Sequence, residues 1–265
     1  MLSWRLLRPT THNASFNMAI DEAILRARIE EKVPNTLRLY RWAPSAVSIG
    51  RFQNIHNEVQ LENCRIYGVN VVRRISGGGA VYHDSEDEIT YSVIVKHENL
   101  GTSDVAEAYN QVCNGLIEAA HILGVNAEYN EGSVKQCPNI AVKERKISGS
   151  AQAHKRGVIL QHGTFLVSVD LEKMFRFLNV PKKDACIDYI SIARRKITSV
   201  ADELGKQVKV DQVHEALIRG FEKALSIKLK EGSLTPNELE LAQKLEKEKF
   251  ATREWNFEGK TKLKP

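Results

Sequence analysis

The sequence lacks any apolar run long enough to cross a membrane, which takes about 20 consecutive apolar residues in a helix. Its longest apolar stretches, such as Val158–Leu160 and Thr164–Val169, are broken far short of that length. The first residues, Met1-Leu-Ser-Trp-Arg5, also lack the uninterrupted apolar stretch of a signal peptide. We therefore expect a cytoplasmic protein with no membrane partner.

Cysteine is scarce, and neither charge dominates. The four cysteines, Cys64, Cys113, Cys137 and Cys186, show no CxxC spacing, and the eight histidines are scattered. This pattern argues against a zinc site and against a disulfide framework. The formal net charge of +5 suits an acidic partner, but the sequence has no basic stripe of the kind that nucleic-acid binding requires. We expect no nucleic-acid partner.

Hydrophobic periodicity and turn residues predict an α+β fold. Helical spacing and capping residues predict helices over 13–31, 104–124, 171–178, 211–225 and from Thr235 onward. Short β-rich runs predict strands over 3–7, 36–42, 46–50, 70–74, 80–83, 88–95, 140–142, 146–148 and 158–169. Most of the early strands follow one another without a helix between them, so we expect mixed or antiparallel sheets packed with helices.

The segment Arg73-Arg-Ile-Ser-Gly-Gly-Gly-Ala-Val-Tyr-His-Asp84 carries the strongest chemical signal. Three consecutive glycines let backbone N–H groups approach a phosphate or carboxylate without a Cβ in the way. The two arginines add forked donors that suit phosphate oxygens. A bare triple glycine is more often a flexible turn, and only its flanking residues favour a binding loop. No phosphate-binding P-loop competes, since Gly259-Lys-Thr261 lacks the earlier glycine.

This segment resembles the signature of the lipoate–protein ligase A and biotin ligase superfamily. Lys143–Gln152 and Gln161–Thr164 resemble its second and third signatures, and the likeness runs in order from Phe16 to Phe257. The resemblance implies the biotin/lipoate protein ligase catalytic fold over residues 1–255. It also implies that residues 256–265 form a C-terminal tail and that the C-terminal accessory domain of many such ligases is absent.

The resemblance implies an ATP-dependent lipoate–protein ligase, which converts lipoic acid to lipoyl-AMP and transfers the lipoyl group to a lysine of an acceptor protein. Lys146 would be its catalytic residue, a cation with an ordinary pKa near ~10.4 that lies between the lipoate carboxyl group and the α-phosphate. Mg²⁺ is expected with ATP, because it neutralises the phosphates. The residues implied to bind ATP and lipoyl-AMP are Arg74, Ser76, Gly77, Gly78, Gly79, Ala80, Val81, Tyr82, His83, Lys146, Ser148, Gly149, Ser150, Ala151, His162 and Gly163.

Two histidines near these signatures each allow two interpretations. His83 and Asp84 together would make a general-base dyad, but we favour a packed histidine at a strand end that Asp84 caps. His162 is interpreted as structural beside Gly163, with a substrate-lining role as the alternative.

The sequence departs from the ligase pattern in two respects. Pro138-Asn139 stands where many ligases have an Asn-Asp pair, so the magnesium ligands cannot be assigned. Without the accessory domain, the chain would need a separate small accessory subunit to close the site over the reactive adenylate.

Two other functions were weighed against the ligase. An ATP-independent octanoyl- or lipoyltransferase would use Cys137 as nucleophile, its thiolate favoured by Lys135 and Lys143. The intact Gly77–Gly79 run argues against the transferase branch, in which this run is interrupted. A non-catalytic lipoate or adenylate binder is the third interpretation.

The acceptor is expected to be an acidic lipoyl-domain protein that docks near the basic residues of 143–155.

Overall fold

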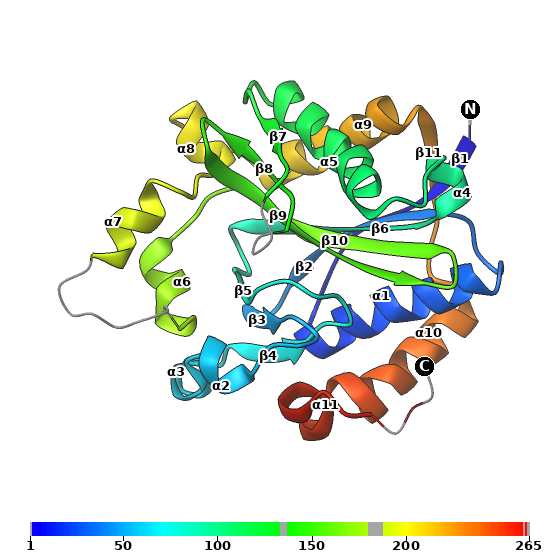
Figure 1. Cartoon of the computed structure of the whole chain (residues 1–265), viewed down its shortest axis with the longest axis horizontal. Coiled ribbons are helices and arrows are strands. Elements are labelled where there is room, and N and C mark those ends of the chain that lie inside the picture. The colour runs from blue at the N-terminus through cyan, green and yellow to red at the C-terminus, as the bar shows by residue number, and fades with distance from the viewer. Residues whose placement is uncertain (1, 133–136, 180–187, 262, 264–265) are drawn as a thin grey trace.

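The computed structural model describes residues 2–132, 137–179, 188–261 and 263 (Figure 1). Its strands are β1 (Leu2–His12), β2 (Thr36–Trp42), β3 (Ala46–Ile49), β4 (Asn70–Arg73), β5 (Val81–His83), β6 (Glu88–Lys96), β7 (Glu128–Asn130), β8 (Asn139–Val142), β9 (Arg145–Lys155), β10 (Val158–Leu166) and β11 (Ile227–Glu231). Its helices are α1 (Ala14–Ile29), α2 (Ile55–Glu58), α3 (Leu61–Ile66), α4 (His97–Leu100), α5 (Val105–Ile122), α6 (Leu171–Phe177), α7 (Tyr189–Arg194), α8 (Val200–Leu204), α9 (Val210–Leu225), α10 (Pro236–Leu245), the π-helical turn η1 (Glu246–Phe250) and α11 (Arg253–Glu258).

Within the described residues the strands form two mixed sheets. The large sheet has the order β11-β1-β2-β6-β10-β9-β8-β7, and the small sheet has the order β4-β3-β5. Strand β1 runs parallel to both β2 and β11, and β3 runs parallel to β4, while the other pairs are antiparallel. The α+β class predicted from the sequence is confirmed.

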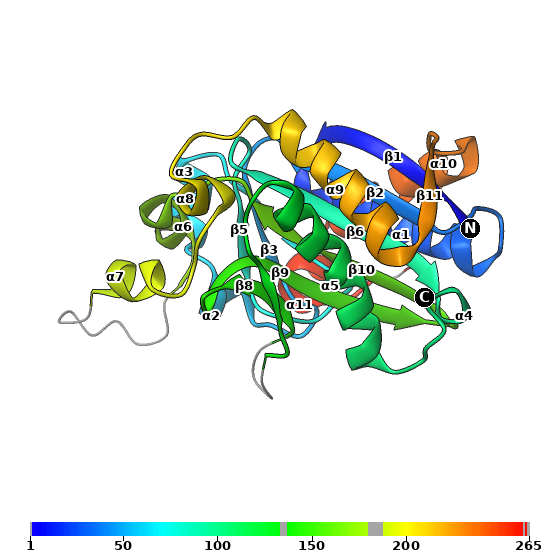
Figure 2. The ribbon, with the colours of Figure 1, turned by 90° about the horizontal axis from the view of Figure 1, so that it is seen from above.

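Helices cover both faces of the large sheet. Helices α5 and α9 lie side by side on one face, and α1 and α10 pack on the other (Figures 1 and 2). Neighbouring residues of one strand serve opposite faces: Val93 joins the core under α5 and α9, whereas Ile94 joins the core under α1. This follows from the two-residue period of a strand, and it explains why β6 is buried along nearly its whole length.

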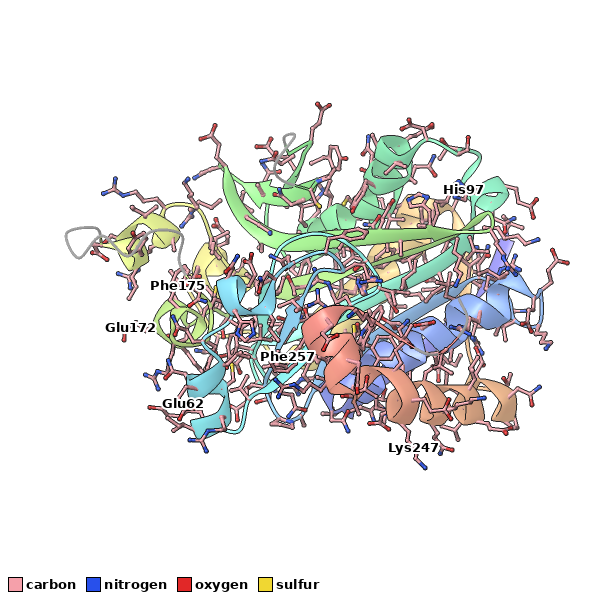
Figure 3. The ribbon with its side chains drawn as sticks, turned by 60° about the horizontal axis from the view of Figure 1, so that its bottom comes forward. Glu62, His97, Glu172, Phe175, Lys247 and Phe257 are labelled. Atoms are coloured by element: carbon pink, nitrogen blue, oxygen red, sulfur yellow. The ribbon has the colours of Figure 1, made fainter. Side chains whose placement is uncertain are left out.

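The small sheet has a core of its own, to which Val47, Ile49 and Tyr82 contribute with Phe177 of α6. Phe257 of α11, labelled in Figure 3, packs against the same cluster from the C-terminal end of the chain. Segments from both ends of the sequence therefore fix the position of the small sheet beside the large one.

The predicted helix starts are confirmed. The side chains of Asn13, Asp104 and Thr235 each accept a hydrogen bond from a backbone N–H group in the first turn of α1, α5 and α10, and Thr235 forms a capping box with Glu238. Within the described residues, no helix is both long and apolar enough to span a bilayer.

Two features of the C-terminal third differ from the prediction. The tail was expected to begin at Asn256, but α11 continues to Glu258 and ends at Gly259, whose φ of +68° terminates it. Strand β11 was not predicted, although Ile227-Lys-Leu-Lys230 alternates apolar and polar residues; the run is short, and its partner β1 lies at the other end of the sequence. The division into a catalytic domain and a tail remains a prediction.

Candidate active site

A cavity of about 750 Å³ opens between the small sheet and strands β8–β10 of the large sheet. It brings together residues from all three sequence signatures. Those in its lining are Arg74, Gly78, Gly79, Ala80, Val81, His83, Lys146, Gly149, Ser150, Ala151, His162 and Gly163. The other residues expected there, Ser76, Gly77, Tyr82 and Ser148, do not line it.

Tyr82 and Ser148 have structural surroundings instead. The Tyr82 ring stacks on Phe177 at 5.1 Å between centroids, and its hydroxyl donates to Asp84. Ser148 is fully buried within β9, where its Oγ has no partner among the described residues. Both side chains support the walls of the cavity from behind.

Arg74 fixes the shape of the glycine loop, defined here as Gly77–Ala80. Its Nη2 donates to the carbonyl oxygens of Gly77 and Gly79, both at 2.9 Å, and its Nη1 donates to the Ser48 carbonyl at 2.9 Å. Burial lowers the pKa of Arg74 to about 10, so the guanidinium remains charged at neutral pH. The hydrogen bonds of Arg74 go to Ser48, Ser76 and the glycine loop, and its expected role as a phosphate ligand stays a prediction.

The backbone of the glycine loop is suited to an oxyanion. No N–H group of Gly77–Ala80 donates to another described residue. Gly78 has a φ of +85°, and a Cβ on Gly50 would lie 2.0 Å from the Gly78 carbonyl oxygen. Unpaired N–H groups in such a turn form a concavity for negative charge.

Arg73, the other arginine of the signature, is structural. Its guanidinium donates to six backbone carbonyls, among them those of Gly50, Trp255 and Asn256. The expectation that both arginines offer charge to a phosphate was wrong for Arg73, because these carbonyls occupy its donors and tie α11 to the segment 50–53.

His83 pairs with Glu88 rather than with Asp84. Its Nδ1 lies 2.7 Å from Glu88 Oε1, its Nε2 lies 2.7 Å from Ser48 Oγ, and its ring stacks on Trp42. Asp84 forms an ion pair with Lys173 at 2.6 Å. The dyad is therefore absent. The favoured interpretation of a packed histidine fits, although Asp84 does not cap it.

His162 also belongs to a buried network. Its Nε2 lies 2.6 Å from Ser76 Oγ, and its Nδ1 lies 3.1 Å from Asp21 Oδ2. Asp21 is paired with Arg38 at 2.7 Å. Burial lowers the pKa of His162, so the ring is neutral at neutral pH. The ring also lines the cavity, so both interpretations of His162 apply.

Lys146 reaches into the cavity from β9. A Cβ on Gly149 would lie 2.6 Å from its Nζ, so the lysine passes directly over that glycine. The Lys146 side chain is exposed to the cavity, and protein surrounds the cavity. This enclosure lowers the pKa of Lys146. The charge of Cys137 opposes the decrease, and the charge of Arg74 adds to it. The expected ordinary pKa was wrong, because the sequence does not reveal this enclosure. Lys146 Nζ has no partner among the described residues.

Cys137 lies at the same site. Its Sγ would be 3.8 Å from a Cβ on Gly78, and its charge influences both Arg74 and Lys146. The thiol is exposed. Burial raises the pKa of Tyr109, a buried residue of α5, and the charge of Cys137 raises it further. Lys135, the lysine that the sequence also placed near this thiol, lies outside the described residues, as does Cys186.

The residues present do not fit a protein-held magnesium ion. No group of three or more His, Cys, Asp or Glu residues among those described is arranged to hold a metal. Among the described residues that line the cavity, Glu144 is the one carboxylate, and Asn139 offers an amide. Oxygen ligands from carboxylates are what Mg²⁺ prefers, so the side chains offer it little.

Comparison with known proteins identifies the family. Residues 13–222 match the family model described as the lipoyl protein ligase A/B catalytic domain. The chain belongs to this family. It is an enzyme of the lipoate ligase and transferase superfamily, as its signatures predicted, and it acts in protein lipoylation.

The most similar relatives overturn the predicted ligase activity. The chain is 36% identical to the octanoyltransferase LipM of Brevibacillus brevis over 97% of this chain and 99% of the relative. Other bacterial relatives, 30–37% identical over nearly the whole chain, carry the same name. The main expectation, an ATP-dependent ligase, was therefore wrong, and the transferase alternative is better supported. The intact glycine run did not discriminate between them, because an oxyanion loop suits both reactions.

Solved structures confirm the predicted catalytic fold. The structure of lipoate-protein ligase A bound with ATP superposes with a TM-score of 0.85 at 32% identity, covering 97% of this chain and 99% of that one. The bipartite lipoate protein ligase of Thermoplasma acidophilum, described with its E2 lipoyl domain, gives a TM-score of 0.86 at 32% identity over 99% of both chains. In that related lipoylation system the acceptor is a lipoyl domain.

Two basic residues of the cavity lining were not predicted: Arg195 and Lys196 follow α7, where no motif stands out. Tyr109 was assigned only to the apolar face of its helix, and its electrostatic coupling to Cys137 was not predicted. The Lys146 N–H donates to Lys196 O at 2.8 Å, and Thr198 N–H donates to Lys146 O at 2.9 Å. Only this long-range pairing brings that basic segment to the mouth of the cavity.

Proposed function

We propose that this chain is an octanoyltransferase that moves an octanoyl group from a carrier thioester to a lysine of a lipoyl domain, through a thioester on Cys137. The observation that carries the proposal is the position of Cys137, which shares one cavity with Lys146, Arg74 and the glycine loop. The names of the most similar relatives support it.

In the first step the Cys137 thiol gives its proton to the neutral form of Lys146. The thiolate attacks the carbonyl carbon of the donor thioester, a new C–S bond forms, and the carbonyl oxygen becomes an oxyanion. The bond to the carrier sulfur then breaks, and the departing thiolate takes the proton back from Lys146. The lowered pKa of Lys146 favours this exchange, because it brings the proton affinity of the amine nearer to that of a thiol.

In the second step the ε-amine of the acceptor lysine attacks the carbonyl carbon of the Cys137 thioester. A C–N bond forms, Lys146 takes a proton from the nitrogen, and Cys137 leaves as the thiolate and is protonated by Lys146. The products are an amide and the free thiol, so neither ATP nor a metal is consumed.

The oxyanion of both steps needs hydrogen-bond donors that are already in position. The unpaired N–H groups of Gly77–Ala80 supply them, and the charged Arg74 beneath the loop adds positive potential. Losing one donor of this kind commonly lowers kcat by about 10²–10³. Tyr109, whose pKa is raised by burial and by the charge of Cys137, would lie near the sulfur in both steps.

The accessory subunit was expected because a reactive adenylate needs protection from water. Under this proposal that need is smaller, because a thioester is less prone to hydrolysis than an acyl adenylate. The bipartite lipoate protein ligase from T. acidophilum remains a comparison case for an enzyme made of two parts.

The test compares two donors with one lipoyl-domain acceptor: an octanoyl-carrier-protein thioester without ATP, and free octanoate or lipoate with ATP and Mg²⁺. We expect acceptor modification only from the thioester, and its loss in Cys137→Ser. Equal activity of Cys137→Ser, or modification only in the presence of ATP, would reject the proposal.

A further inference from the structure

The buried guanidinium of Arg74 has no carboxylate partner among the described residues. A fully buried cation without compensation is costly. Its hydrogen bonds to side chains go to two serine hydroxyls, Nη1 to Ser48 Oγ at 2.8 Å and Nε to Ser76 Oγ at 3.4 Å. Each serine is the first member of a buried chain of groups that ends on a carboxylate.

The first chain runs through Ser48, His83 and Glu88. Because Arg74 only donates hydrogen bonds, Ser48 Oγ accepts from it, and the Ser48 hydroxyl donates to His83 Nε2 at 2.7 Å. The His83 proton then lies on Nδ1, which donates to Glu88 Oε1 at 2.7 Å. All three side chains are buried. Thr90 also donates to Glu88 Oε1, at 2.6 Å.

The second chain has the same order. Ser76 Oγ accepts from Arg74 and donates to His162 Nε2 at 2.6 Å, and His162 Nδ1 donates to Asp21 Oδ2 at 3.1 Å. These side chains are buried as well. Arg74 therefore stands between two carboxylate–histidine–serine chains that come from different strands, loops and helix α1, and from different segments of the sequence.

We propose that His83 and His162 are positioning residues, which act through Ser48 and Ser76 to hold the Arg74 guanidinium against the carbonyls of Gly77 and Gly79. In this arrangement the glycine loop keeps its N–H groups free, and the charge of Arg74 stays near Cys137. Neither histidine touches the thioester or the amine. The inference deepens the proposed function, since it rests on Cys137 as the reacting group.

The chain offers a matched control. Ser92 is as buried as Ser48 and donates at 2.9 Å to Asp21 Oδ1, the oxygen that pairs with Arg38 and not the one that faces His162, so its hydroxyl lies outside the two chains that lead to Arg74. Ser48→Ala, Ser76→Ala and Ser92→Ala each remove one buried hydroxyl and add no bulk. All three should lower Tm, but only the first two should change the chemistry.

Two readouts separate positioning from general stability. The first is kcat for octanoyl transfer, which we expect to fall about tenfold in Ser48→Ala and in Ser76→Ala with little change in KM, as one lost hydrogen bond implies. The second is the rate at which iodoacetamide alkylates Cys137 in a Cys186→Ser background. Cys64 and Cys113 are buried, and burial raises their pKa to about 11 and about 12, so they react slowly at neutral pH.

Alkylation should slow severalfold in Ser48→Ala and Ser76→Ala, because Cys137 is already exposed and only its electrostatic surroundings change. His83→Gln, whose amide offers one donor and one acceptor, should retain more activity than His83→Phe. The inference is overturned if the Ser92→Ala control loses as much kcat and alkylation rate as the other two, or if none of the three changes. Alkylation needs no acyl donor, so it tests the two chains even where the proposed transfer reaction fails.

Discussion

Gly149→Ala should reduce catalysis without reducing stability. The new Cβ would lie 2.6 Å from Lys146 Nζ and 2.7 Å from its Cε, well inside normal contact distance. The backbone at Gly149 does not have a positive φ, and the next neighbour, Thr164 Oγ1, is at an ordinary 4.0 Å. The flexible end of the lysine must therefore move by about 1 Å, and a shift of that size costs up to about 10²-fold in rate.

Gly163→Ala is the matched comparison on the neighbouring strand. There the Cβ would lie 2.1 Å from the Gly149 carbonyl oxygen, which is backbone and cannot swing aside, so Tm should fall markedly. The assay is kcat for octanoyl transfer beside a thermal melt of each variant. If Gly149→Ala turns over at the native rate with a native Tm, Lys146 does not act from the position seen here.

Three further outcomes are expected. Lys146→Met should lower kcat by about 10²–10³. It should leave Tm at pH 7 unchanged or higher, because burial lowers the pKa of Lys146 and so opposes its charge. A large drop in Tm would contradict this. The apparent KM for an acidic lipoyl domain should rise with salt, because Arg195 and Lys196 at the cavity mouth attract it over a Debye length of about 8–10 Å; a flat response leaves recognition to shape. Burial lowers the pKa of His162, so the unfolded chain takes up a proton that the folded chain excludes as pH falls below about 6.5. Stability should therefore decrease between pH 7 and pH 5, and His162→Gln should show a smaller decrease in Tm over that interval.

Hydrophobic periodicity and capping residues predicted most of the fold. Strand β2 has the predicted bounds of 36–42, and the caps at Asn13 and Thr235 are where the residue types placed them. Helix α11 could have been found, because Thr252 caps its start and Gly259 ends it. Strand β11 carries an apolar–polar alternation over Ile227–Lys230 that was overlooked, but its parallel pairing with β1 could not be read from so short a run.

The sequence predicted which signature segments meet at the cavity, but not which side chains pair with each other there. Adjacent residues such as His83 and Asp84 look like partners in a sequence, yet successive side chains of a strand point to opposite sides. His83 therefore meets Glu88, and Asp84 meets Lys173. Likewise, the lowered pKa of Lys146 arises from enclosure by distant segments, which no local pattern reports.

The most direct test of the central claim is the covalent state of Cys137 after brief exposure to octanoyl-carrier protein, without ATP and without acceptor. Intact-mass measurement followed by peptide mapping should find one octanoyl group on the peptide that contains Cys137, removable by hydroxylamine and discharged when a lipoyl domain is added. A chain that remains unacylated, or one that carries the octanoyl group on another residue, would contradict the account.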